Sequence, residues 1–247
     1  NGETLSHTLF SLIHAMRTGG FDLFSFHAIA PNLFVDLACA PVISHVHGLD
    51  HQRQKWRGMG SKLILAAEKR MVASATRVVT VNREIVDYYQ RAYGIEAALL
   101  PNGIHPVSDD FAPDLATLER FGLRPGKFVV SIARLVPEKR IHDTLAAFAH
   151  MPDGTKLAVV GDGATTPDYV DRLRAIAGDR VIFTGQQAGA SLQTLFRCAS
   201  AYVSASELEG VPSSLLGCLD CGIPAVVGDV APHRELLGYF RARRKVC

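Results

Sequence analysis

Short apolar segments alternate with longer amphipathic segments along most of this chain, and this alternation limits its fold more than any other feature. Segments such as PVISHVHG (41–48), KFVVSIARL (127–135) and TKLAVVGDG (155–163) are short and mainly apolar. Intervening segments such as REIVDYYQRAYG (83–94) place apolar side chains at helical spacing. Apolar strands joined by helices are typical of parallel sheets with covering helices. The sequence therefore predicts an α/β fold.

The alternation runs in order through the whole chain. The expected strands are 21–28, 41–48, 76–82, 96–103, 127–135, 155–163, 180–185, 201–206 and 224–229. The expected helices are 4–17, 31–40, 50–75, 83–94, 142–151, 166–178, 191–200 and 213–221.

The pattern stops near the middle and then restarts, which predicts two Rossmann-like domains with parallel sheets. We assign residues 1–103 to the first and residues 127–238 to the second. Residues 104–126 contain three prolines and a cluster of acids, and we expect a hinge there. The short segment 239–247, which is rich in basic residues, is expected to be an irregular tail. Because the first domain opens on a helix and not on a strand with a glycine turn, we expect an incomplete N-terminal domain. Because the tail 239–247 breaks the alternation and no further element follows it, we also expect a cut or altered C-terminus.

Composition excludes several classes of protein. Of the 247 residues, 48% are hydrophobic and 20% are charged, so a sizeable buried core is possible. The net charge of +2 gives no basis for binding nucleic acid. Five scattered cysteines fit a reducing, cytoplasmic compartment better than a disulfide framework. No secretory signal pattern and no apolar run of about 18 residues is present.

Two segments of the second domain have the chemistry of an anion site. Arg134 and Lys139 follow the expected strand 127–135, and ligands of α/β sheets bind at the carboxyl ends of strands. An arginine can chelate phosphate oxygens, and a lysine adds a point charge, so the two residues suit a diphosphate. The alternative is a solvated loop with ordinary surface bases.

The second segment is ELEGVPSS (207–214), which opens a helix. Backbone N–H groups at a helix start attract anions, whereas the carboxylate of Glu209 suits a sugar hydroxyl. The segment therefore suits a molecule with both a diphosphate and hydroxyl groups. The alternative is a capping acid, which stabilises a helix start by roughly 0.3–1 kcal/mol.

Taken together, these segments resemble a known family. The run Arg134-Leu-Val-Pro-Glu-Lys139 resembles the G-R-L-x-x-x-K strand and loop of the family 4 (group 1) glycosyltransferases. Three later segments resemble further conserved segments of that family and occur in the same order: VVGDG (159–163), VIFTG (181–185) and EGVPSSLLGCLDCGIPAVVGD (209–229). The first half resembles a bacterial branch that includes rhamnosyltransferase-like enzymes, in HVHGLDHQRQKW (45–56) and PNG (101–103).

The resemblance implies a GT-B fold, in which two Rossmann-like domains face a cleft and the C-terminal domain holds most of a nucleotide-sugar. It implies transfer of a sugar with retention of configuration to a saccharide or lipid-linked acceptor, as in cell-surface glycan assembly. It implies no metal and no cofactor, because the nucleoside-diphosphate sugar is a substrate.

The resemblance also implies roles for residues. Arg134 and Lys139 would grip the donor diphosphate and stabilise the leaving nucleotide. His47 would lie beside the donor sugar. The remaining donor-binding residues would be Glu209, Gly210, Val211, Pro212, Ser213 and Ser214 for the sugar and phosphate, with Gly185 and Gln186 near the base.

One position departs from the family. The family pattern is E-x7-E, and counting from Glu209 the second glutamate, which commonly binds ribose, is replaced by Gly217. A decayed or truncated copy that binds nucleotide weakly or offers a partner surface is therefore one alternative. A nucleotide-sugar epimerase of the same fold is another, but the expected pair of cleft carboxylates is not found.

Three further patterns were weighed against ordinary structural explanations. His45, His47 and His51 could form a metal cluster, although no acid partner is fixed. Cys218 and Cys221 have thioredoxin-like spacing, but structural packing is the favoured interpretation. The helical stripe within 53–72 could touch anionic lipid at a membrane surface, against the alternative of a core-facing stripe; it consists of Trp56, Met59, Leu63, Ala67 and Met71.

Overall fold

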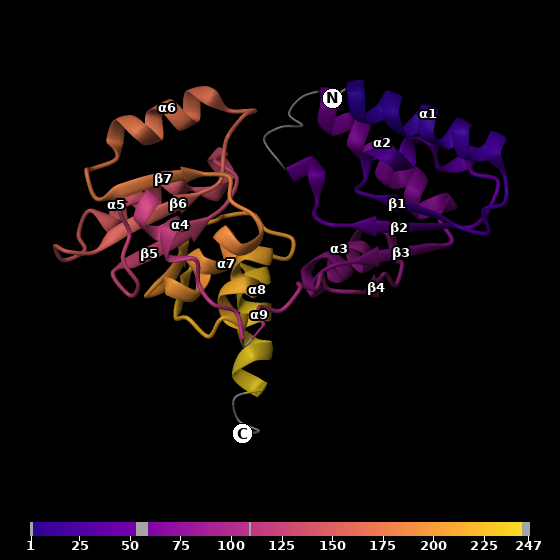
Figure 1. Cartoon of the computed structure of the whole chain (residues 1–247). Helices are drawn as coiled ribbons and strands as arrows, with labels where there is room; N and C mark the ends of the chain where they lie inside the picture. Colours follow the sequence, from indigo (N-terminus) through magenta and orange to yellow (C-terminus); the bar gives the residue numbers. More distant parts are fainter. Residues whose placement is uncertain (1, 53–58, 109, 244–247) are drawn as a thin grey trace. The chain divides into compact units, whose positions relative to one another are not determined.

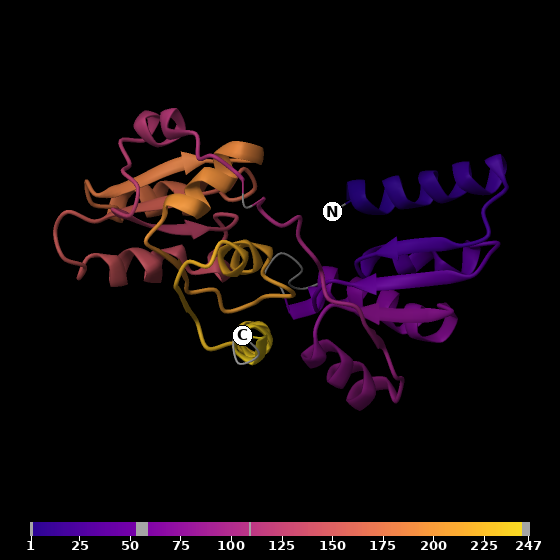
Figure 2. The same ribbon diagram turned by 60° about the horizontal axis from the view of Figure 1, so that its bottom comes forward.

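The computed structural model describes residues 2–52, 59–108 and 110–243. The chain divides into two compact units, residues 1–102 and residues 103–247, each built around its own sheet (Figures 1 and 2). The boundary places residues 104–126 in the second unit, where a hinge between domains was expected. Among the described residues, no helix is both long and apolar enough to cross a membrane.

The first unit contains a four-stranded parallel sheet in the order β1-β2-β3-β4. Its strands are β1 (Phe24–His27), β2 (Val42–Val46), β3 (Arg77–Thr80) and β4 (Ala98–Leu99). Its helices are α1 (Gly2–Thr18), η1 (Ala30–Leu37), η2 (Asp50–Gln52), α2 (Met59–Ser74) and α3 (Arg83–Tyr93). Helix α3 has sequence-encoded ends, because the Asn82 side chain accepts from the Ile85 N–H at 2.9 Å and Gly94 ends the helix in the left-handed region.

The second unit contains a five-stranded parallel sheet in the order β7-β6-β5-β8-β9. Its strands are β5 (Phe128–Ile132), β6 (Lys156–Val160), β7 (Val181–Gly185), β8 (Ala201–Ser204) and β9 (Ala225–Val227). Its helices are α4 (Leu115–Arg120), η4 (Pro137–Lys139), α5 (Ile141–Phe148), α6 (Pro167–Ile176), α7 (Gly189–Cys198), α8 (Ser213–Asp220) and α9 (Ala231–Arg243).

Both faces of this second sheet are covered by packed side chains. Phe128 and Val130 of β5 belong to one buried cluster, which includes Leu195 and Leu215. Val129 of the same strand belongs to a second buried cluster, which includes residues of α5 and α6. Alternate residues of a strand point to opposite faces, so β5 is buried from both sides, and its sequence is apolar except for the buried Ser131.

The predicted α/β fold with two Rossmann-like halves is confirmed, and each expected strand contains one observed strand. Two of the described α-helices were not expected. Helix α4 lies within the segment expected to be a hinge, and its N-cap Asp114 accepts a bond from the Ala116 N–H at 3.2 Å. Helix α9 continues to Arg243, where an irregular tail was expected from residue 239.

Candidate functional site

The strand order of the second sheet reverses between β5 and β8. From β5 the chain continues through α5 to β6, whereas from β8 it continues through α8 to β9 on the other side of the sheet. The loops after β5 and β8 therefore run in opposite directions from neighbouring strands. A crevice at such a point is where open α/β sheets bind ligands.

A pocket of 330 Å³ lies at the carboxyl ends of β5, β6 and β7. The exposed Arg134 and the predicted base-side residue Gln186 both line it. Among the described residues, no ion pair involves the Arg134 side chain. The complete lining is Ile132, Ala133, Arg134, Val160, Gly161, Asp162, Gln186 and Gln187.

Gly161 lets two strand ends approach closely in the wall of this pocket. Its φ is +136°, and a Cβ atom there would lie 1.9 Å from the Ala133 carbonyl oxygen. The adjacent loops are joined by the Leu135 N–H, which donates to the Asp162 carbonyl at 2.7 Å. Gly161 is thus required by backbone packing, and the Gly161-Asp162-Gly163 turn supports the pocket.

Lys139 and Glu209, predicted from separate segments, come together at the reversal of strand order. The Lys139 Nζ donates to the Glu209 Oε1 at 2.5 Å, and the side chains are only 15% and 10% exposed. Lys139 lies in η4 after β5, and Glu209 lies in the loop after β8. A diphosphate that binds Lys139 would therefore share it with a carboxylate.

The start of α8 differs in detail from the anion site that its sequence suggests. Pro212 occupies the N-cap position, makes no side-chain cap and has no N–H to offer. The Ser214 hydroxyl bonds the buried Tyr202 hydroxyl at 2.8 Å. The predicted contacts of Gly210, Val211 and Ser213 with a donor stay predictions, as does a place near the base for Gly185, which ends β7.

Gly217, at the position where the family pattern has its second glutamate, is buried in the middle of α8. A Cβ atom there would lie 3.0 Å from two ring carbons of Phe196, a residue of α7. A longer side chain would require the Phe196 ring to move. The glycine therefore fits its present packing partner, and the carboxylate expected at this position is replaced by an aromatic contact.

In the first unit, three histidine rings stack at the end of β1 and β2. The ring centroids of His27 and His45 are 4.7 Å apart and nearly parallel, and His27 Nδ1 lies 3.0 Å from His47 Nε2. Burial, followed by the proximity of His27, lowers the pKa of His45. Sequence reasoning missed His27, although parallel pairing of the two apolar strands brings it opposite His45.

His51 does not join this stack. Its Nδ1 lies 3.5 Å from the buried carboxylate of Glu68, and its ring contacts Tyr88. No group of three or more side chains suited to hold a metal is found in the part of the chain that the structure describes.

The other weighed patterns have structural roles where they are described. Cys218 is buried, and burial raises the pKa of its thiol to about 12, so it is not a thiolate at neutral pH. Ala67 and Met71 of the helical stripe belong to the core, whereas Leu63 is partly exposed. Trp56 lies outside the described residues.

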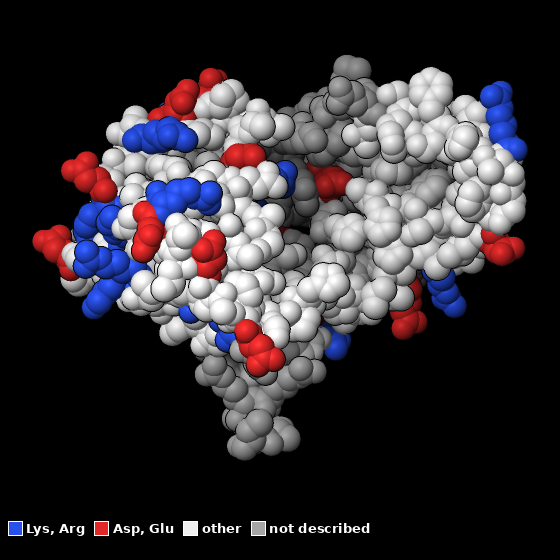
Figure 3. Space-filling model, in the orientation of Figure 1, with Lys and Arg blue, Asp and Glu red and all other residues white. Residues whose placement is uncertain are grey.

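The described charged side chains do not form a single basic patch on the visible face of the second unit. Basic and acidic side chains are interspersed there (Figure 3). This distribution agrees with the small net charge of the chain.

Comparisons with known proteins match both halves of the chain. A family model described as glycosyltransferase family 4 matches residues 5–107, and one described as glycosyl transferases group 1 matches residues 119–241. The more specific resemblance to a rhamnosyltransferase-like branch stays a prediction.

Two curated relatives and one solved structure illustrate the similarity. TuaC of Bacillus subtilis, provisionally named a teichuronic acid biosynthesis glycosyltransferase, is 26% identical over 92% of the chain and 55% of its own length. A GDP-mannose-dependent phosphatidylinositol monomannoside mannosyltransferase of Mycolicibacterium smegmatis is 30% identical over 66% of the chain and 46% of its own length. Anabaena HepE in complex with UDP and glucose has a TM-score of 0.74 at 20% identity, covering 87% of the chain and 61% of HepE. The chain spans about half the length of the curated relatives it matches.

Proposed function

The chain belongs to the group 1 glycosyltransferases, with family 4 and group 1 regions in its two GT-B halves, and on this premise we propose that it transfers a sugar from a nucleoside-diphosphate donor. The acceptor would be a saccharide or a lipid-linked saccharide of cell-surface glycan assembly, reached from the cytoplasmic side and, for a lipid-linked acceptor, in contact with the membrane. The transfer would retain the configuration of the donor sugar.

The observation that carries the proposal is the arrangement of Arg134, Lys139 and Glu209 around the reversal of strand order. Arg134 lines the pocket after β5, and Lys139 is held 2.5 Å from Glu209 of the loop after β8. Two cations and one carboxylate within one sheet edge match a ligand with phosphates at one end and sugar hydroxyls at the other. A guanidinium can bind two phosphate oxygens at once, and the carboxylate can accept from sugar hydroxyls.

The chemistry follows from where charge develops. When the bond from the sugar to the diphosphate breaks, negative charge grows on the leaving nucleoside diphosphate. Arg134 and Lys139 would stabilise that charge more strongly than the charge of the intact donor, which lowers the barrier to transfer. Lys139 already forms an ion pair with Glu209, so its ammonium group would be held in place before the donor binds.

The names of similar proteins support this donor class. HepE was crystallised with UDP and glucose, and the Mycolicibacterium smegmatis relative is named GDP-mannose-dependent. We propose that Gln186, which lines the pocket, and Gly185 next to it lie near the base. We also propose that His47 of the first unit contacts the donor sugar.

A second candidate function rests on Gly217. Because this position packs against Phe196 and carries no carboxylate, ribose binding would lack one contact that the family resemblance implies. A copy that binds nucleotide without transferring sugar is therefore the alternative.

Titration calorimetry with UDP, GDP and dTDP tests the proposal. We expect one nucleotide to bind, and we expect Arg134→Ala to abolish that binding. The matched control is Arg124→Ala, another exposed arginine of the same unit that does not line the pocket. Binding by neither the chain nor the control would overturn the donor site. If UDP-glucose or GDP-mannose bound but no free nucleotide appeared when saccharide acceptors were present, the non-transferring copy would be favoured.

A further inference from the structure

We propose that Arg140 is a positioning residue that holds the two donor-binding loops together and thereby sets the place of Lys139. The inference rests on the proposed function, because it assigns Arg140 a task only if Lys139 binds a diphosphate. Arg140 itself would not touch the donor. It would act through the loop that carries Glu207 and Glu209.

The first observation is the unusual backbone of Arg140. Its φ of 48° and ψ of 41° place it in the left-handed region, which a non-glycine residue rarely adopts. Arg140 ends η4 and precedes α5, and its N–H donates to the Pro137 carbonyl at 3.0 Å. Conformations of this kind persist where surrounding contacts hold them, and they cluster at functional sites.

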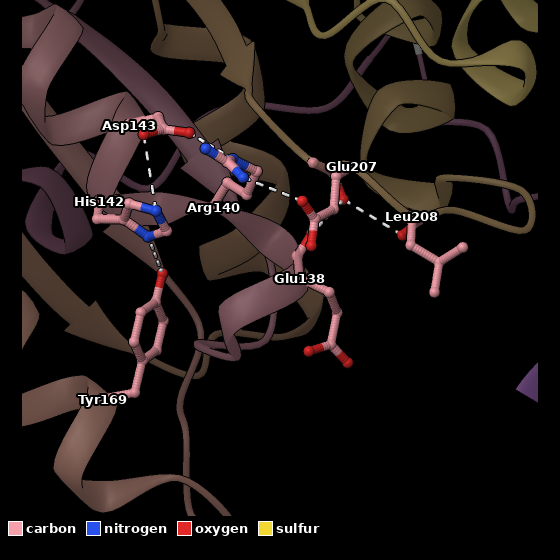
Figure 4. Close-up of polar contacts among 8 residues, drawn as sticks. Glu138, Arg140, His142, Asp143, Tyr169, Glu207 and Leu208 are labelled. Atoms are coloured by element: carbon pink, nitrogen blue, oxygen red, sulfur yellow. Dashed lines mark hydrogen bonds and ion pairs between the residues drawn. The ribbon is translucent and has the colours of Figure 1, made fainter. Parts of the chain in front are cut away.

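The second observation is what the side chain of Arg140 contacts. Its guanidinium lies between two carboxylates, with Asp143 on one side and Glu207 on the other (Figure 4). The Nε donates to Asp143, and the Nη1 lies 3.0 Å from the Glu207 Oε2. Asp143 is in α5, whereas Glu207 is in the loop after β8. The arginine therefore joins the two sides of the strand-order reversal.

The third observation is that the same two loops are also joined by backbone bonds. The Glu207 N–H donates to the Glu138 carbonyl at 3.1 Å, and the Ser206 hydroxyl lies 3.4 Å from the same oxygen. Three consecutive residues after β5 therefore contact two acids of the loop after β8. Glu138 and Arg140 both contact Glu207, and Lys139, between them in the sequence, contacts Glu209. The geometry makes Lys139 the middle member of a three-residue connection.

Charge gives the connection a further consequence. Glu207 and Glu209 are both acids of the loop that would face a diphosphate. Arg140 pairs with Glu207, so Lys139 is left to divide its charge between Glu209 and the ligand alone. Without Arg140, the exposed Glu207 carboxylate would lose its ion-pair partner, and its charge would oppose the approach of an anion.

Four substitutions in the full 247-residue chain, two of which are also combined in a double variant, test the inference. Glycine accepts the left-handed backbone without strain, so Arg140→Gly removes the side chain and leaves the local fold intact. Arg140→Ala removes the same side chain and keeps the strain. Arg140→Lys keeps a cation, and Glu207→Gln removes the carboxylate partner.

We expect the Kd of the nucleotide that binds the wild-type chain to rise about fivefold in Arg140→Gly, the size of effect given by one exposed ion pair. The melting temperature of Arg140→Gly should equal or exceed that of Arg140→Ala. Arg140→Lys should recover most of the affinity. Glu207→Gln should add no further loss to Arg140→Gly, because both changes break the same pair.

Two results would overturn the inference while leaving the proposed function standing. One is wild-type affinity in Arg140→Gly while Arg134→Ala abolishes binding. The other is a loss of affinity that follows the loss of melting temperature across the variants, with no recovery in Arg140→Lys, which would make Arg140 only a structural residue. Failure of the wild-type chain to bind UDP, GDP or dTDP would instead defeat the proposed function and this inference together.

Discussion

Lys139 and Glu209 are 70 residues apart in the sequence, yet the Lys139 Nζ lies 2.5 Å from the Glu209 Oε1. The pair crosses from the loop after β5 to the loop after β8, where the order of the sheet reverses. The two side chains are mostly buried, so each charge depends on the other for compensation. A residue proposed to bind phosphate is therefore also part of what holds the two loops together.

This pairing predicts unequal effects of single and double substitutions on stability. Lys139→Met keeps the aliphatic stem but leaves the Glu209 carboxylate without its partner, and we expect the free energy of unfolding to fall by about 2 kcal/mol. Lys139→Met combined with Glu209→Gln should regain at least half of that loss, because the uncompensated charge is gone. Urea unfolding of Lys139→Met, Glu209→Gln and the double variant measures both values. Additive losses in the double variant would show that the two side chains are energetically independent.

Gly161 should not tolerate a side chain. Its φ of +136° and the 1.9 Å distance from a built Cβ to the Ala133 oxygen oppose any substitution. We expect Gly161→Ala to lower the free energy of unfolding by about 3 kcal/mol. Gly178→Ala is the control, since a Cβ there meets nothing within 4 Å. Equal stability of the two alanine variants in urea unfolding would contradict the close approach of the strand ends.

Substitution by alanine should change the stability differently at two helical glycines. Gly238 of α9 has open space around it, so Gly238→Ala should stabilise the chain by up to about 1 kcal/mol through helix propensity. Gly217 of α8 faces the Phe196 ring at 3.0 Å, so Gly217→Ala should give no gain or a loss. Phe196→Leu should relieve that loss when combined with Gly217→Ala. A clear gain from Gly217→Ala alone would show that the ring moves freely.

The histidine stack should make the first unit more stable as pH rises through the range just below 6.5. Burial lowers the pKa of His45 from its ordinary value of 6.5, so the unfolded chain binds this proton more readily than the folded chain does. The contribution of His45 is then present above pH 6.5 and is lost as pH falls toward the lower folded pKa.

Urea unfolding across this pH range tests the expectation. His45→Gln should reduce the slope of stability against pH, whereas His7→Gln, on the exposed side of α1, should leave it unchanged. The NMR titration of His45 should give a pKa below 6.5. An unchanged slope in His45→Gln would assign the pH dependence to another group.

Much of the fold could be read from local patterns. Several features depend only on neighbouring residues. They are the apolar runs of the strands, the cap residues Asn82 and Gly94, and the position of Arg134 and Lys139 after a strand. Helix α4 was missed because the prolines and acids around it indicate a loop, and its ordering depends on contacts with the rest of the second unit. One such contact is the Asp114 N–H, which donates to Thr194 at 2.9 Å.

The sequence by itself determined which segments form the strands and most of the helices, and it predicted which residues would carry the chemistry of an anion site, because periodicity and residue type act over a few neighbouring positions. Only the tertiary structure decided which of these residues meet. Four contacts join segments that are far apart in the chain. They are the pairing of Lys139 with Glu209, the contact of Arg140 with Glu207, the packing of Gly217 on Phe196 and the stacking of His27 on His45. They follow from strand order and from the close packing of helices on the sheet, and neither is encoded within any single segment.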